Sequence, residues 1–224
     1  MKTVIVGDIH GRVDVVKRVL ELGYPTVFVG DILDSYDRSV DEQIECLDLL
    51  LDAPDSVDVL YGNHELSYLD PVMRCSGYKE RTHDAVLLRK GLIKDKFKEH
   101  VWLNDDVLVT HAGVSKSVCN ELKDVKNYLK SPYRKVIGYY RGGLSPCGGM
   151  FWCDYNVEFI PIAGLRQVFG HTEHAHLGEN HGIRKRKGNY NVDCLSRKKK
   201  VLVYDSVEDT FSSKSLNSEW EKYE

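Results

Sequence analysis

The stretch MKTVIVGDIHG, residues 1–11, opens the chain with a β-branched run that ends in a glycine, an aspartate and a histidine. A short apolar, β-branched run of this kind predicts a buried strand. Two further runs, residues 26–29 and 57–60, end in the same way, the first in GD (30–31) and the second in GNHE (62–65). The chain is therefore predicted to begin with three buried strands, each followed at once by polar side chains.

Apolar side chains with helical spacing lie between these strands. Residues 13–22 and 40–51 repeat them every three or four positions, which predicts two amphipathic helices. Strands that alternate with helices form largely parallel sheets, and the periodicity alone favours a doubly wound α/β sheet. Two more strands are predicted at residues 106–110 and 167–169, and residues 190–205 are predicted to form a hairpin of two strands.

Length and composition limit the class of protein. The chain has 224 residues, of which 42% are hydrophobic and 29% charged, as in ordinary globular proteins. We expect one domain over residues 1–224. A net charge of -3 argues against a general nucleic-acid binder. No signal peptide or membrane-spanning run is visible, and the cysteines have no paired spacing, so we expect a cytoplasmic protein with reduced thiols and no membrane association.

Polar side chains gather where the five predicted strands end. They are Asp8 and His10, Asp31 and Asp34, Asn63 and His64, His111, and His171. In open α/β sheets the carboxyl ends of the strands share one edge, so we expect these side chains to converge. Carboxylates and imidazoles suit manganese, iron and zinc, and a carboxylate such as Asp31 can bridge two ions. The sequence thus predicts a centre for two divalent metal ions, manganese being expected, with iron or zinc as alternatives.

The stretches around these residues resemble the calcineurin-like metallophosphoesterase superfamily. They are GDIHG (7–11), GDILD (30–34), GNHE (62–65), HAG (111–113) and GHT (170–172). The similarity is greatest to the phosphoprotein phosphatase branch, which includes small bacterial and phage Ser/Thr phosphatases. The resemblance implies a fold of the α/β (α+β) class, with a β-sandwich core flanked by helices and strand–helix alternation in the first half.

The resemblance also implies a role for each site residue. One metal ion would be held by Asp8, His10 and Asp31. The other would be held by Asp31, Asn63, His111 and His171, so that Asp31 is the bridge. His64 would act as the general acid, and Asp34 would orient it. The position two residues after His171, where several relatives carry a second histidine, is Glu173, and His174, His176 and His181 are predicted to be surface-loop residues.

The implied function is metal-dependent hydrolysis of phosphate monoesters, as in Ser/Thr protein phosphatases, with a phosphoprotein or a nucleotide as the substrate. A second hypothesis on the same scaffold is a nucleotide-directed hydrolase that cleaves a diadenosine polyphosphate, a 2′,3′-cyclic nucleotide or a nucleic-acid terminus. A third is a binding module without activity, and His64 argues against it because a scaffold needs no proton donor.

The sequence departs from the family where substrate binds. The phosphatase branch carries arginine where this chain has Ser35 and, in small relatives, where it has Tyr61. A phosphoryl group benefits from bidentate guanidinium contact. The candidates for this contact are Arg38, Arg12 and Arg141, while Arg166 reads more readily as a solvated side chain. The basic runs 184–187 and 197–200 are interpreted either as solvated hairpin loops or as an electropositive rim that attracts a polyanion.

Overall fold

The first half of the chain alternates strands and helices, as its sequence predicts. The computed structural model describes residues 1–70, 74–131, 137–173 and 182–221, which leaves His174, His176 and His181 outside the described residues. In chain order, the alternating elements are β1 (Lys2–Val6), α1 (Val13–Glu21), β2 (Thr26–Phe28), α2 (Val40–Leu51), β3 (Val57–Leu60) and α3 (Asn63–Leu69). The two predicted helices and three predicted strands are thus confirmed to within a residue or two.

The first sheet is built mainly from this half. Its order is β11-β10-β1-β2-β3-β4, and β1, β2, β3 and β4 (Phe97–Lys98) run parallel to one another. Strands β10 (Lys200–Asp205) and β11 (Thr210–Ser215) complete it as an antiparallel pair, with β10 beside β1. The chain therefore returns at its end to pair with the strand that opened it.

The second sheet contains the remaining predicted strands. Its order is β5-β6-β7-β9-β8, with β6 parallel to β7 and β7 parallel to β9. Its strands are β5 (Val101–Trp102), β6 (Val107–Val109), β7 (Arg166–Phe169), β8 (Arg184–Arg186) and β9 (Asn189–Asn191). Because the fourth and fifth predicted strands lie here, the parallel strands are divided between two sheets instead of forming the single doubly wound sheet that periodicity favours.

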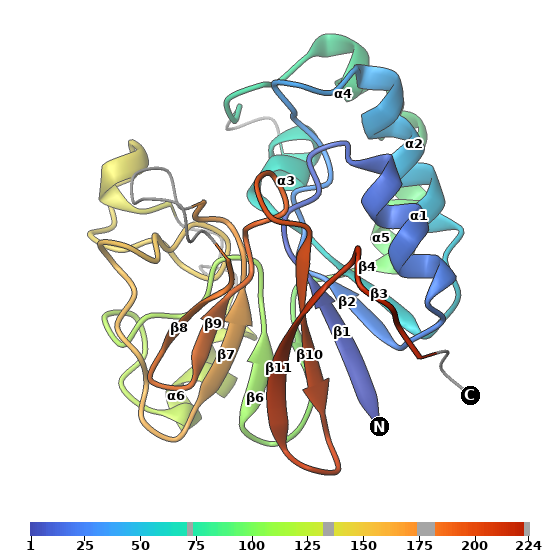
Figure 1. Cartoon of the computed structure of the whole chain (residues 1–224). Coiled ribbons are helices and arrows are strands. Elements are labelled where there is room, and N and C mark those ends of the chain that lie inside the picture. The colour runs from blue at the N-terminus through green and yellow to red at the C-terminus, as the bar shows by residue number, and fades with distance from the viewer. Residues whose placement is uncertain (71–73, 132–136, 174–181, 222–224) are drawn as a thin grey trace.

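The two sheets pack face to face. Along β1, Val4 and Val6 pack in the core under the helices, whereas Ile5 packs against residues of the second sheet such as Val109 and Val168. Successive side chains of a strand point to opposite faces, so β1 is apolar throughout because both of its faces are covered. Figure 1 shows α1, α2, α4 (Glu80–Leu88) and α5 (Lys90–Lys96) on one side of the first sheet and the second sheet on the other. The predicted β-sandwich core flanked by helices is confirmed.

The far face of the second sheet, which faces away from the first sheet, is covered by a short helix and by the long segment that precedes β7. Leu108 of β6 packs there with Val125 of α6 (Leu122–Tyr128) and with Phe151 from the long segment that precedes β7. That segment includes the short 3₁₀ helix Tyr139–Arg141.

Within the described ranges, no helix is long and apolar enough to span a bilayer.

The predicted hairpin over residues 190–205 is wrong. Strand β9 pairs with β8 across a turn at Lys187 and Gly188, which both have positive φ, while β10 pairs with β1 and β11 in the other sheet. The basic run at 184–187 is accordingly mostly an edge strand and not the predicted loop, while the second run leads directly into β10. The two neighbouring apolar runs resemble a hairpin in sequence, but they do not pair with each other: β9 pairs with β7 and β8, and β10 pairs with β1 and β11.

Candidate metal centre

The predicted ligands meet where strand ends of both sheets come together. Asp8, Asp31 and Asn63 follow or lie close behind strands β1, β2 and β3 of the first sheet. His111 and His171 follow β6 and β7 of the second sheet. The site is therefore assembled across the sandwich, not along the edge of one sheet as the sequence suggested.

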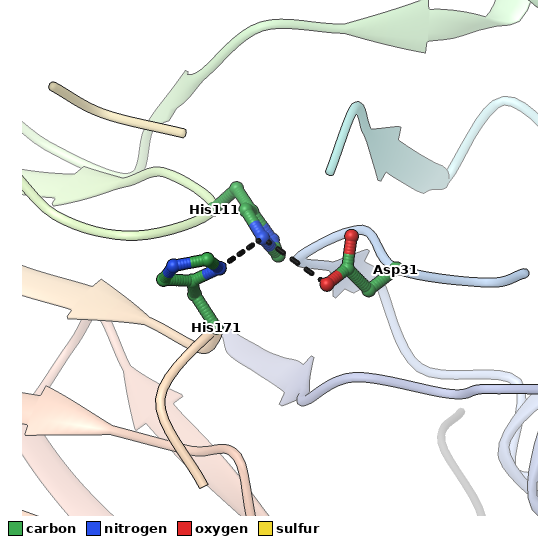
Figure 2. A group of neighbouring side chains, drawn as sticks. All are labelled: Asp31, His111 and His171. Carbon is green, nitrogen blue, oxygen red and sulfur yellow. Dashed lines mark hydrogen bonds and ion pairs between the residues drawn. The ribbon is translucent and has the colours of Figure 1, made fainter. Parts of the chain in front are cut away.

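One group of side chains surrounds the amide oxygen of Asn63. This oxygen lies 2.8 Å from Nε2 of His111 and 2.9 Å from Nδ1 of His171, and the two imidazole nitrogens are 3.2 Å apart. Oδ2 of Asp31 lies 3.4 Å from His111 Nε2. Figure 2 shows Asp31, His111 and His171 pointing toward one another from three separate segments. The amide nitrogen of Asn63 donates to Sγ of Cys75 at 3.3 Å, which keeps the amide oxygen turned toward the histidines.

A second group shares Asp31. Single donor atoms of Asp8, His10 and Asp31 all lie within 4.8 Å of one another, as do those of Asp31, His111 and His171. The structure thus brings together all six side chains predicted to hold metal ions, with Asp31 common to both groups. A shared carboxylate between two sets of N and O donors is the arrangement expected of a two-metal centre.

Backbone carbonyls fix which imidazole nitrogen faces the site. Nδ1 of His111 lies 2.9 Å from the carbonyl oxygen of Val29, and Nδ1 of His10 lies 2.7 Å from that of Leu33. A carbonyl oxygen only accepts, so both rings carry a proton on Nδ1 and leave Nε2 as the donor atom for a metal. The orientation of these two rings is therefore set by the β2 strand end and the turn after it.

Burial and crowded charge suit the site to cations. Burial, together with the carboxylate of Asp193, raises the pKa of Asp8 well above its usual value. Burial would also raise the pKa of Asp31, but the neighbouring imidazoles, His111 first, hold it well below its usual value. Burial lowers the pKa of His171 well below its usual range, which leaves a neutral ring. Buried carboxylates and imidazoles gathered in this way fit divalent ions, because a cation offsets the negative charges and accepts the lone pairs of the ring nitrogens.

The backbone at the site is strained. Among the described residues, six that are not glycine have positive φ, and four of these belong to the site: His10, Asp31, Asp34 and His171. Each such residue costs about 1–2 kcal/mol of conformational free energy.

Two glycines permit the close approach of backbone to ligands. A Cβ at Gly62 would lie 2.0 Å from Oδ1 of Asp31, and one at Gly170 would lie 1.9 Å from Oδ1 of Asp8.

Glu65 holds this strained backbone in place. Its buried carboxylate accepts hydrogen bonds from the peptide N–H groups of Asp31 (2.9 Å), Ile32 (2.8 Å), Leu33 (3.1 Å) and Gly62 (2.9 Å). It therefore ties the turn after β2 to the start of α3. Sequence reasoning included Glu65 in a motif but gave it no role, and its position in the first turn of a helix after a glycine was the available signal.

His64 lies beside the metal ligands without belonging to either group. Its peptide N–H donates to Oδ1 of Asp31 at 3.1 Å, and its Nε2 lies 3.9 Å from Oδ2 of the same carboxylate. Its Nδ1 donates to Oδ2 of Asp34 at 2.8 Å. Burial lowers the pKa of His64, but the charges of Asp31 and Asp34 more than offset this and raise it to about 9. The ring is thus held in the form that can give up a proton.

This pKa predicts a pH dependence of stability in chelator-treated protein. The folded pKa of His64, about 9, lies above its ordinary value of 6.5. Its contribution to the free energy of unfolding is therefore fully present below pH 6.5 and is lost as the pH rises through about 9. Urea unfolding at several pH values in this window should show this loss in the wild type. The His64→Gln variant should lose less stability across the same window, and parallel curves for the two proteins would contradict the assignment.

The three predicted phosphate-binding arginines all have carboxylate partners. Arg38 lies 3.3 Å from Glu42, and Arg12 donates to the carbonyl of Ile9 at 3.1 Å and lies 3.7 Å from Asp37. The guanidinium of Arg141 lies 3.3 Å from Asp154 and 3.2 Å from Glu158. Arg166 pairs with Asp106 and Asp209. The carboxylates named here are not among the six predicted metal ligands.

All six cysteines are free thiols, as predicted. Cys147, Cys153 and Glu158 do lie together, with donor atoms within 4.8 Å. The oxygens of Glu158, however, already accept from the peptide N–H groups of Gly148 and Asp154 and from Arg141. A cation there would compete with the guanidinium of Arg141, which argues against a metal site at this group.

The comparisons with known proteins agree with this geometry. A family model described as calcineurin-like phosphoesterase matches residues 1–193. A solved protein serine/threonine phosphatase from Saccharomyces cerevisiae is similar in fold at 16% identity, with a TM-score of 0.56 over 96% of this chain and 80% of that one. No curated protein matches the chain in sequence.

Other solved structures are more distant. A metallophosphoesterase from Sphaerobacter thermophilus has 14% identity and a TM-score of 0.46, over 96% of this chain and 89% of that one. An archaeal phosphodiesterase has 14% identity and a TM-score of 0.43, over 95% and 98%. The family match spans most of the chain and both groups of converging side chains. The protein therefore belongs to the calcineurin-like phosphoesterase family of metal-dependent hydrolases that act on phosphate esters.

Proposed function

We propose that this protein hydrolyses phosphate monoesters of the kind that Ser/Thr protein phosphatases cleave. The observation that carries the proposal is the pairing of His64 with Asp34, 2.8 Å apart, next to the predicted ligand Asn63. An alkyl monoester such as phosphoserine releases a strongly basic alkoxide, which needs a proton as the bond to phosphorus breaks. A protonated imidazole beside the centre meets this need.

The predicted ligands divide between two ions. Asp8, His10 and Asp31 would hold one, and Asp31, Asn63, His111 and His171 the other. We propose manganese, with iron or zinc as alternatives, since carboxylate, amide and imidazole donors suit all three. When bound, the ions offset the charge of the phosphate oxygens and make hydroxide available near neutral pH.

The chain's own residues orient the reaction. Asp34 holds the Nδ1 face of His64, so that Nε2 is turned toward Asp31 and the side of the site where the ester oxygen would leave. Glu65 holds the backbone of Asp31, whose side chain is shared by both ligand groups. Proton donation from His64 Nε2 is then the chain's direct contribution to breaking the ester bond.

We propose that Arg12 and Arg141 flank the phosphate, with Arg38 next to Arg12. The positive charge of Arg12 contributes to lowering the pKa of His10, after burial and His64, and that of Arg141 does the same at His171, after burial and His111. Each guanidinium therefore lowers the pKa of one predicted ligand, Arg12 in one ligand group and Arg141 in the other. Their carboxylate partners would keep them oriented while phosphate binds.

A phosphoprotein or a nucleotide in the cytoplasm remains the proposed substrate.

Local contacts weaken the case that the basic runs 184–187 and 197–200 attract a polyanion. Arg184 donates to Asn156, Arg186 to the carbonyl of Phe159, and Arg197 and Lys199 pair with Glu173 and Asp14. These contacts favour a structural use for much of the basic charge, so the proposal assigns these runs at most a secondary part in substrate attraction.

A substrate panel tests the proposed function. Protein loaded with manganese is assayed on para-nitrophenyl phosphate, its bis ester, a phosphoserine peptide, a dinucleoside polyphosphate and a 2′,3′-cyclic nucleotide. We expect the two monoesters to be hydrolysed fastest, chelation to abolish turnover and added manganese to restore it. Preference for the bis ester or the cyclic nucleotide would instead support the nucleotide-directed hypothesis, and no turnover of any substrate would support a binding module.

A further inference from the structure

The carboxylate of Asp34 has two partners, one for each oxygen. Oδ2 accepts from Nδ1 of His64 at 2.8 Å, and Oδ1 accepts a hydrogen bond from the hydroxyl of Tyr68. Both side chains are buried, Asp34 at 3% and Tyr68 at 2% exposure. With one bond to each oxygen, the two contacts set the plane of the carboxylate.

Tyr68 is itself fixed in place. It lies on α3 four residues after His64, and side chains at this spacing share one face of a helix. Its ring stacks on Tyr78, with centroids 4.7 Å apart and planes inclined by 18°. The peptide N–H of Lys79 donates to its hydroxyl oxygen at 3.1 Å, which leaves the hydroxyl proton for Asp34. Burial raises the pKa of Tyr68, so the hydroxyl stays protonated.

We propose that Tyr68 is a positioning residue for the proton donor, locking Asp34 so that His64 is held in line with the ester oxygen. The inference rests on the proposed function. Rotation about the last bond of an aspartate is soft, so one hydrogen bond does not define its plane, whereas two opposed bonds do. The Asp34 backbone is held as well, because its N–H donates to Oε1 of Gln43 at 2.9 Å.

Loss of the Tyr68 hydroxyl should therefore act through His64. In Tyr68→Phe the ring can still stack on Tyr78, but Oδ1 of Asp34 is left buried without its donor. A buried acceptor without a partner is costly, so the carboxylate turns toward another donor and His64 loses its fixed orientation. The result is a slower proton transfer without loss of metal ligands.

The leaving group separates this role from a structural one. We expect Tyr68→Phe to lower kcat on a phosphoserine peptide by about tenfold, with KM little changed. On para-nitrophenyl phosphate the fall should be less than about threefold, because nitrophenolate leaves without a proton. In an Asp34→Asn background the same change should cost nothing further, since Tyr68 acts through Asp34. Equal losses on both substrates, or additive losses in the double variant, would overturn the proposal.

A matched control and a second readout complete the test. Tyr24→Phe also removes a buried tyrosine hydroxyl bond, to the carbonyl of Glu221 at 2.8 Å, and should leave the ratio of the two kcat values unchanged. Proton NMR of the His64 Nδ1–H, assigned by its loss in His64→Gln, needs no turnover. We expect a sharp downfield signal in the wild type and a broadened one in Tyr68→Phe. An unchanged signal refutes the role of Tyr68, whereas a wild type inactive on both monoesters refutes the proposed function alone.

Discussion

Replacing His64 with alanine is expected to lower kcat on a phosphoserine peptide by about 10²–10⁴-fold, the usual contribution of a positioned general acid. The ring donates to Asp34 and contributes no atom to either ligand group. Metal stoichiometry, measured by calorimetric titration of manganese into the chelator-treated variant, should therefore equal that of the wild type. The loss should shrink markedly on para-nitrophenyl phosphate.

Chemical rescue provides the control for this variant. Free imidazole should restore part of the turnover of His64→Ala on the phosphoserine peptide and should not accelerate the wild type. Near wild-type turnover by His64→Ala on that peptide would show that the proton comes from another group. Loss of metal binding in the variant would show instead that His64 supports the centre structurally.

The second large effect is expected at Glu65. Its carboxylate accepts four peptide N–H groups in a buried site. Each oxygen accepts two of these N–H groups, so in Glu65→Gln, where one oxygen becomes an NH₂ group, two of them lose their acceptor. Hydrogen bonds to a charged group contribute about 1.5–3 kcal/mol each, so we expect the free energy of unfolding to fall by about 3–5 kcal/mol.

The same change should weaken metal binding, because Asp31 then loses the support of its strained backbone. Urea unfolding and manganese titration measure the two effects. Glu42→Gln is the matched control: Glu42 also accepts a peptide N–H, that of Ser39, but at the exposed start of α2. It should cost less than about 1 kcal/mol. Equal stability of the Glu65 and Glu42 variants would contradict the role assigned to Glu65.

The sequence was informative wherever local pattern and chemistry agreed. The alternation in the first half follows from apolar periodicity, and the five polar clusters sit where strands end. Each cluster is short and bounded by glycine, so its position does not depend on long-range pairing. The six predicted ligands were therefore found by pattern, and the structure adds their convergence, although their roles as ligands remain a prediction.

Long-range pairing was not predictable in the same way. Strand β10 is apolar on both faces and follows β9 closely, which imitates a hairpin, yet it pairs with β1 about two hundred residues earlier in the sequence (register Lys2↔Asp205). Likewise, nothing local distinguishes β6 and β7 from strands of the first sheet. The choice of sheet depends on which faces can be covered together, and that is a property of the whole core.

The supporting residues Glu65 and Tyr68 were missed for a related reason. The chain after GNHE was not assigned to a helix, although α3 begins at Asn63. Once a helix is recognised there, Tyr68 falls on the face of His64, and Glu65 falls in the first turn near the free N–H groups. The residues that position a site are thus visible in a sequence only when the element carrying them has been recognised.

The placement of ligands on both sheets has a thermodynamic consequence. The proposed ions are held by residues of both sheets: Asp8, Asp31 and Asn63 follow strands of the first sheet, and His111 and His171 follow strands of the second. Bound ions would therefore link the two sheets to each other. Any ligand that binds only the folded chain adds to its stability, by about 2.7 kcal/mol at a free concentration one hundred times Kd. Sliding or opening of the sheets would then cost more free energy as the free metal concentration rises, increasing with its logarithm, and the melting temperature would rise with metal concentration.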